Sequence, residues 1–243
     1  MGLSLAARGY ASESGMALER ALRLDTAAGQ AQEQGFDVAC LAQRALWSGD
    51  ADGARTLANR AWDLAHVERL ERDFIGAARL QGAAALALGD LTTADERLHH
   101  ALTRARSVNW VEEELPALAG LAELRRRQGD SRAARELLDD VWESAERGPY
   151  PLFHADALNV LAQIDRDAGN HQAAVDAATK AYRLAWCDGP PYAYHWGLEA
   201  AKKHLRDMGA AAPTDLAPFD ESKYEPMPEV EINPTDKFGS DAN

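Results

Sequence analysis

Glycine recurs in this chain at a spacing of 40 residues. It stands at positions 9, 49, 89, 129, 169 and 209 of the 243-residue sequence. An acidic or amide residue directly follows four of these glycines, namely Asp50, Asp90, Asp130 and Asn170. A repeat of roughly 20 to 50 residues is typical of a solenoid, in which each repeat is one supersecondary unit that stacks on its neighbours. The glycine register therefore favours a repeat array over a single globular core.

The apolar residues between the glycines follow a helical period. Spacings of three and four residues connect Leu115, Leu118, Ala119 and Ala122 before Gly129, and Ala134, Leu137, Leu138, Val141 and Trp142 after it. This pattern predicts two amphipathic helices in each unit. We expect Gly129 to lie just past the first helix, where a left-handed backbone is needed, and Asp130 to cap the second.

Small residues also recur in register. They stand at Ala42, Gly82, Ala122 and Ala162 in the first helix, at Ala54, Ala94, Ala134 and Ala174 early in the second, and at Ala65, Ala105, Ala145 and Ala185 later in it. We expect the first two sets to mark close crossings between paired helices. Enlarging Ala134 is then expected to cost about 1–3 kcal/mol through overpacking.

A helix, a Gly-Asp turn and a second helix with small residues at fixed offsets resembles the tetratricopeptide repeat family. The resemblance implies an all-α, right-handed superhelical solenoid of antiparallel helix pairs. A period of 40 instead of the usual ~34 residues implies extended helices. The expected organisation is a repeat array over residues 1–209, followed by an extended tail over 210–243; the units lie near 1–29, 30–69, 70–109, 110–149 and 150–189, with a capping helix at 190–209.

Both ends of the array depart from the repeat. Gly9 has only eight residues before it, which predicts either a degenerate N-terminal cap or the C-terminal piece of a longer protein. The last helix is expected to begin at Asp188 and the following prolines, and to end near Met208. The tail over 210–243 contains five of the ten prolines and eight acidic residues. It is expected to be disordered or to lie along the repeats through Phe219, Tyr224, Met227, Val230 and Ile232.

Composition and motif content argue against several classes of function. The chain has 26 Lys and Arg against 39 Asp and Glu, a formal charge of −13, so we expect no nucleic acid and no membrane surface as a partner. Cys40 and Cys187 are isolated, and His99 and His100 point about 100° apart on a helix, so we expect no disulfide, no metal and no cofactor. With no secretion signal, a cytoplasmic location is expected.

The resemblance also implies a binding face. Helix A of each tetratricopeptide unit lines the concave groove, and the corresponding residues here are Gln43, Trp47, Arg79, Glu123, Arg126, Arg127, Asn159, Gln163 and Arg166. Arginine pairs bidentately with carboxylates, which favours an acidic protein or extended peptide, or the acidic tail of this chain, as occupant. The alternative is that these side chains form ordinary solvated helix faces.

Three functional hypotheses therefore stand side by side. The first is noncatalytic recognition of a protein or peptide, with no catalytic residues. The second is a C-terminal sensor array of a bacterial STAND-type signalling ATPase, which the segment from Trp186 to Leu205 resembles. The third is a small-molecule-binding or catalytic protein that uses the aromatic cap between Trp186 and Trp196, where Cys187 and His195 are the reactive side chains.

Overall fold

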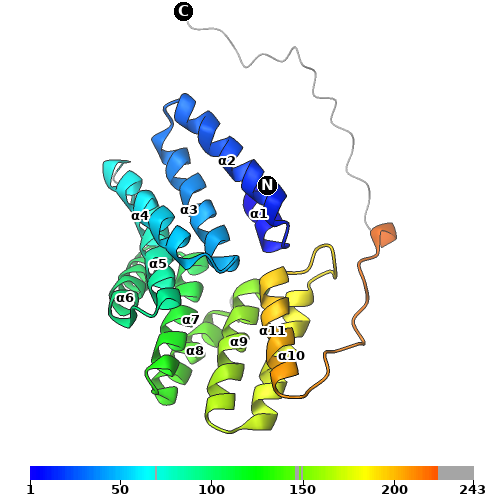
Figure 1. Cartoon of the computed structure of the whole chain (residues 1–243). Coiled ribbons are helices and arrows are strands. Elements are labelled where there is room, and N and C mark those ends of the chain that lie inside the picture. The colour runs from blue at the N-terminus through cyan, green and yellow to red at the C-terminus, as the bar shows by residue number, and fades with distance from the viewer. Residues whose placement is uncertain (69, 146–147, 149, 224–243) are drawn as a thin grey trace, which may run out of the picture.

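The computed structural model describes residues 1–68, 70–145, 148 and 150–223, and in these residues it is helical without strands. The helices are α1 (Gly2–Ala7), α2 (Ala11–Ala27), α3 (Ala31–Trp47), α4 (Ala51–Glu68), α5 (Glu71–Leu88), α6 (Leu91–Ser107), α7 (Val111–Arg127), α8 (Ser131–Ala145), α9 (Pro151–Asp167), α10 (His171–Trp186) and α11 (His195–Asp207), followed by a short 3-10 turn, Glu221–Lys223. The chain is thus the all-α helical solenoid expected from the sequence (Figure 1).

The predicted glycine turns are confirmed. All six glycines of the register have positive φ, for example 81° at Gly89 and 82° at Gly129. This left-handed residue lets the next amide reach back, so that Asp90 N–H donates to the Ala85 carbonyl at 2.9 Å. Positive φ also occurs at three positions halfway between these glycines, at Gly29, Asn109 and Gly189.

The predicted capping aspartates are present in three turns. The side chain of Asp130 accepts from Ala133 N–H at 2.9 Å, and those of Asp50 and Asp90 make the equivalent bonds. Each satisfies one of the amides that a helix start leaves unpaired. Asn170 stands at the same position in the fourth turn, but its side chain makes no capping hydrogen bond. The side-chain cap is therefore missing at the start of α10.

The helices form two layers. Each helix packs antiparallel on the next, and the odd-numbered helices also pack on one another, α3 on α5, α5 on α7, α7 on α9 and α9 on α11. Within the described part of the chain, the even-numbered helices make no comparably extensive contacts with each other. The odd-numbered helices therefore lie on the inner side of the curve that Figure 1 shows, and the even-numbered helices lie outside.

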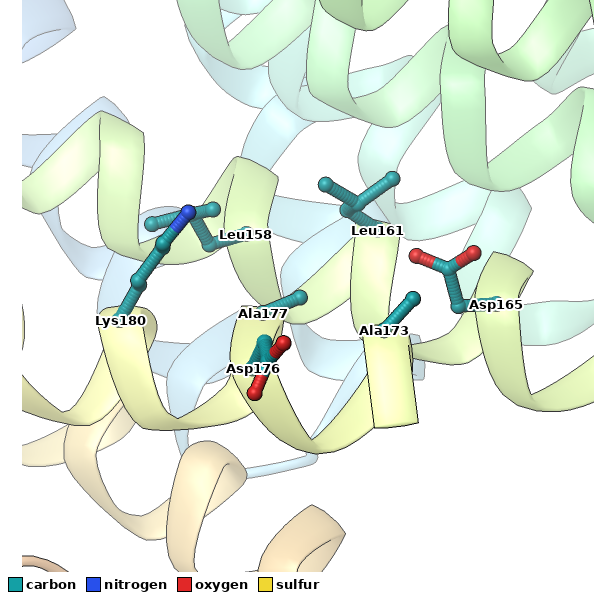
Figure 2. Close-up of a pocket in the computed structure, with 7 residues that line it drawn as sticks. All are labelled: Leu158, Leu161, Asp165, Ala173, Asp176, Ala177 and Lys180. Carbon is teal, nitrogen blue, oxygen red and sulfur yellow. The ribbon is translucent and has the colours of Figure 1, made fainter. Parts of the chain in front are cut away.

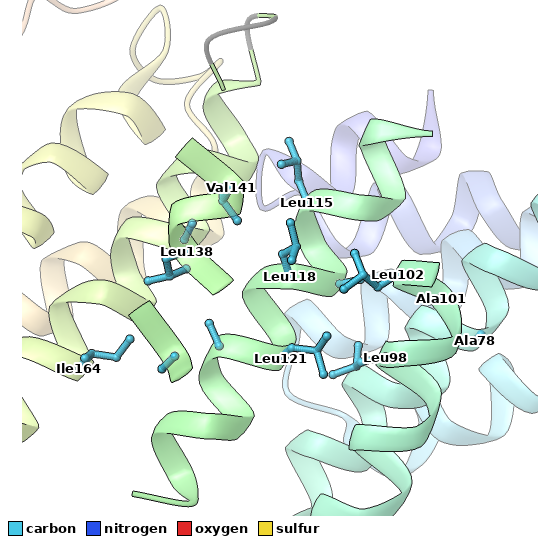
Figure 3. Close-up of a cluster of buried hydrophobic side chains, with 14 residues drawn as sticks. Ala78, Leu98, Ala101, Leu102, Leu115, Leu118, Leu121, Leu138, Val141 and Ile164 are labelled. Carbon is cyan, nitrogen blue, oxygen red and sulfur yellow. The ribbon is translucent and has the colours of Figure 1, made fainter. Parts of the chain in front are cut away.

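Small residues set the spacing between the layers. The recurring residues at the crossings are all buried, including Ala42, Ala122, Ala134 and Ala174 at 0–1% exposure. A Cβ at Gly82 would lie 2.6 Å from the Leu98 Cγ, which leaves no room for alanine. Around them, leucines such as Leu118 from α5 to α9 form the largest apolar cluster (Figure 3).

The C-terminal helix begins later than the sequence analysis predicts. α11 starts at His195 instead of near Asp188, and residues 188–194 form turns through a cis Pro190–Pro191 peptide. Because Pro191 disfavours a helical Pro190 and neither proline offers an amide hydrogen, the helix starts only beyond the pair. Its end at Gly209, with φ 69°, is as predicted.

The first part of the tail is docked on the array. Residues 210–220 are extended; Ala210 and Leu216 pack on the cluster of α9, α10 and α11, and Asp215 accepts from Arg183 of α10 at 2.8 Å. The Phe219 ring lies 4.5 Å from that of Tyr192. The other predicted anchors, Tyr224, Met227, Val230 and Ile232, lie outside the described residues.

Candidate functional site

The nine predicted binding residues all come from odd-numbered helices. Gln43 and Trp47 lie on α3, Arg79 on α5, the residues 123, 126 and 127 on α7, and 159, 163 and 166 on α9. Because these helices run parallel to one another on the inner side, residues at equivalent positions lie in a row across them. The row is polar, but most of its members are already bonded within the chain.

The first part of the row connects three helices. The Arg79 guanidinium is paired with Glu113 of α7 and donates to the Gln43 Oε1 at 3.0 Å. The Arg79 and Glu113 side chains are only 12% and 14% exposed. Breaking such a partly buried charge pair costs more free energy than breaking an exposed one, because removal of either partner leaves the other charge desolvated and without compensation. Glu113, which the sequence analysis did not select, is thus part of the row.

The second part of the row lies on α7 and α9. Glu123 accepts from both Arg126 and Arg127, and Arg126 also pairs with Asp167. Burial acts to raise the pKa of Glu123, but the hydrogen bonds from the two arginines outweigh it and lower the pKa. Arg127 further donates to the Leu86 carbonyl at 2.6 Å.

The row loosens toward α11. Arg166 is 41% exposed and comes no closer than 3.7 Å to Asp207. Gln163, one turn before it, is half-buried. The prediction that Asn159 faces a ligand is wrong: it is 6% exposed, and its Nδ2 donates to the Gly197 carbonyl at 3.1 Å, because α11 packs over this part of α9. Of the predicted arginines, Arg166 is therefore the most loosely paired.

The two ends of the array contact each other. The Trp47 ring of α3 stacks on Trp196 of α11 at 6.5 Å between centroids, and lies edge-on to Tyr194 at 6.1 Å. Trp196 Nε1 donates to the Ala6 carbonyl at 2.7 Å, and Arg8 Nε donates to the Pro191 carbonyl at 2.7 Å. The array therefore closes at the side chains of α1, α3 and α11 instead of leaving an open groove at Trp47.

A buried acid lies beneath this closure. The Tyr194 hydroxyl donates to the Asp156 Oδ2 at 3.0 Å, and Tyr194 is 4% exposed. Burial raises the pKa of Asp156 to about 7, and the bond from Tyr194 limits the rise. Burial also raises the pKa of Tyr194, and the nearby Asp156 charge adds to that rise. The closure is thus built on a carboxyl group that ionises near neutrality.

The aromatic cap is used for packing. Trp186 Nε1 donates to the Ala217 carbonyl of the tail at 2.8 Å, and the His195 ring lies edge-on to Trp196 at 4.8 Å. Burial raises the pKa of the Cys187 thiol. A raised pKa reduces the thiolate fraction, which is opposite to what a nucleophilic cysteine requires.

Two shallow hollows stand out in the part of the chain that the structure describes. One, of about 250 Å³, lies between α9 and α10 and is lined by Leu158, Leu161, Asp165, Ala173, Asp176, Ala177 and Lys180 (Figure 2). Asp165 at its edge is paired with Arg135 of α8. The other, of about 350 Å³, lies where the two ends meet and is lined by Arg8, Gly9, Tyr10, Pro190, Pro191, Ala193, His195, Leu198, Glu199 and Lys202. Neither contains one of the nine residues predicted on the inner helices, but the second includes His195 of the aromatic cap.

The described residues contain no group of three or more His, Cys, Asp or Glu side chains arranged to hold a metal ion. Among them, no helix has the length and apolar character needed to cross a membrane.

The fold resembles that of a solved structure. The crystal structure of BtubC (BKLC) from P. vanneervenii matches with a TM-score of 0.53 and 17% sequence identity, over 88% of this chain and 95% of that chain. At this identity the likeness shows a shared fold. No protein-family model matches the chain, and no curated protein matches it.

Proposed function

We propose that this chain is a noncatalytic binding module that recognises an acidic, extended segment of a protein on the inner face of its odd-numbered helices. The observation that carries the proposal is the polar row itself. Arginines from α5, α7 and α9 lie on one face, each opposite a carboxylate of a neighbouring helix. An acidic peptide can replace such carboxylates without any rearrangement of the backbone.

The most exposed pair of the row points to where binding starts. Arg166 and its partner Asp207 are 41% and 37% exposed, and an exposed pair contributes only about 0–1 kcal/mol. Replacing Asp207 with a peptide carboxylate therefore costs little, whereas Arg126 is 15% exposed and holds both Glu123 and Asp167. The docked part of the tail lies along α10, an outer helix, and so supports a partner other than residues 210–220 for this face.

Fluorescence anisotropy with labelled short peptides tests the proposal. We expect an acidic extended peptide to bind, a basic one of equal length not to bind, and affinity to fall with salt as charge interactions are screened. The double variant Arg126→Ala/Arg166→Ala should weaken binding at least tenfold. Arg55→Ala/Arg132→Ala, which removes the same charge from exposed positions on α4 and α8, is the matched control. Equal losses in both variants would refute a role for the inner face.

A further inference from the structure

The first helix interface departs from the repeat at two facing positions. In later units, one alanine stands near the end of the even helix and another near the start of the next odd helix, as Ala65 and Ala77 or Ala105 and Ala117 do, and these alanines are at most 1% exposed. The equivalent positions of the first interface are Asp25 and Asp37. Two carboxyl groups thus stand where later units have buried alanines.

One oxygen of the Asp37 carboxyl is left without a partner. Asp37 is 6% exposed, and its Oδ2 accepts no hydrogen bond from any described residue. Burial raises the pKa of Asp37 to about 6, and a side-chain hydrogen bond shared with Asp25 and the charges of Asp25 and Glu33 add to the rise. A buried carboxylate normally has a hydrogen-bonding or charged partner, because desolvating it otherwise costs several kcal/mol or more.

The surrounding carboxylates have no basic partner either. Among the described residues, no lysine or arginine forms an ion pair with Asp25, Glu33 or Asp37, or with Asp73 on the adjacent α5. Glu113, at the position equivalent to Glu33 and Asp73, is by contrast paired with Arg79. This part of the inner face therefore carries a net negative charge, whereas in the rest of the row arginine side chains balance the carboxylates.

Exposed apolar side chains adjoin these carboxylates. Leu24 is 61% exposed and Phe36 is 59% exposed. In the next unit the equivalent of Leu24, Leu64, is covered by α3, where a Cβ on Gly35 would touch it at 3.7 Å. Among the described residues, α1 lies against α2 at Leu18, opposite Gly2, whereas Leu24 further along α2 is left exposed.

We propose that Leu24, Asp25, Glu33, Phe36 and Asp37, here called the acidic end patch, bind a basic amphipathic helix of another protein. Such a helix occupies the place that α3 takes over α4 in the next unit, with apolar residues on Leu24 and Phe36. Its lysine or arginine side chains pair with Asp25 and Glu33 and stabilise the ionised form of Asp37. This surface and its basic partner are independent of the inner-face proposal, which concerns arginines and an acidic partner.

Other occupants fit the patch less well. Residues 224–243 include Glu225, Glu229 and Glu231, and a second copy of the chain presents the same acidic surface, so both meet charge repulsion. A bound metal ion is disfavoured because the described carboxylates are not arranged as a metal site.

Calorimetry with a designed peptide tests the proposal on the full chain. The probe is a synthetic helix with leucines at i, i+3, i+4 and i+7 and flanking arginines, and the control peptide has glutamate in place of each arginine. We expect the basic peptide alone to bind. The double variant Asp25→Ala/Asp37→Ala should weaken its binding at least tenfold; it introduces the alanines found at the equivalent positions of later units, so we expect the fold to be preserved.

Matched variants decide the outcome. Asp63→Ala/Glu96→Ala removes two exposed charges from the outer helices α4 and α6 and should leave affinity within twofold. Phe36→Ser should weaken binding through its apolar contact. An equal loss of affinity in both charge variants would show that binding depends only on net charge, and would overturn the proposal. Binding heat observed with calcium chloride alone, and abolished by the Asp25→Ala/Asp37→Ala variant, would also overturn it and would identify the patch as a cation site. Arg126→Ala/Arg166→Ala should not affect the basic peptide.

Discussion

Replacing Asp156 with asparagine tests whether the closure between the chain ends is strained by a buried charge. The pKa of this carboxyl is raised by burial from the ordinary 3.8 to about 7. Between these values the unfolded state loses its proton while the folded state retains it, so stability falls as pH rises. One pH unit corresponds to about 1.4 kcal/mol, which gives a total loss of up to about 4 kcal/mol by pH 7 and above.

Asp156→Asn removes this titration and keeps an oxygen that accepts from the Tyr194 hydroxyl. We expect the variant to be more stable than the parent by about 1–4 kcal/mol at pH 8, with the gain vanishing only below the ordinary pKa of 3.8, where the parent carboxyl is protonated in both states. Urea unfolding followed by circular dichroism across this range measures the difference. Tyr194→Phe, which removes the bond to Asp156, should destabilise the parent at pH 8. A stability difference that is constant with pH would refute the reasoning.

Two further predictions compare matched positions by thermal unfolding. Gly82→Ala places a Cβ 2.6 Å from the Leu98 Cγ and should destabilise by about 1–3 kcal/mol, whereas Gly76→Ala on the same helix has no atom within 3.7 Å and should stabilise by up to about 1 kcal/mol through helix propensity; changes of the same sign would contradict the packing argument. Asp130→Ala should cost about 1 kcal/mol because a cap bond is lost, and Asn170→Ala should cost less because no cap bond exists there. Equal costs at the two positions would count against side-chain capping.

The helices, the turns and their close crossings follow from the sequence. A positive φ favours glycine, and a buried helix crossing requires a small side chain. Gly129 therefore predicts the turn in which it lies, and Ala134 predicts the close helix crossing in which it is buried. The turns at Gly29 and Gly189 have the same glycine signal as the 40-residue register, whereas the turn at Asn109 has a positive φ without glycine. Local rules fail at Asn170, which makes no cap bond, and at Pro190–Pro191, where the prolines precede the helix instead of opening it.

The composition of the candidate site was decided by the tertiary structure. The sequence places Arg79 and Arg126 on inner helices, but whether an arginine is free or paired depends on the residue that the next helix brings opposite it, here Glu113 and Asp167. The contact of Trp196 with Ala6 spans 190 residues. This contact depends on the curvature of the whole array, to which every helix pair adds a small rotation. The sequence of a single repeat does not show how large the total curvature is. The sequence therefore determined what each unit looks like, and only the packing of all units together decided which side chains meet across the closure and which polar atoms, such as the Asp37 Oδ2, lack a partner among the described residues.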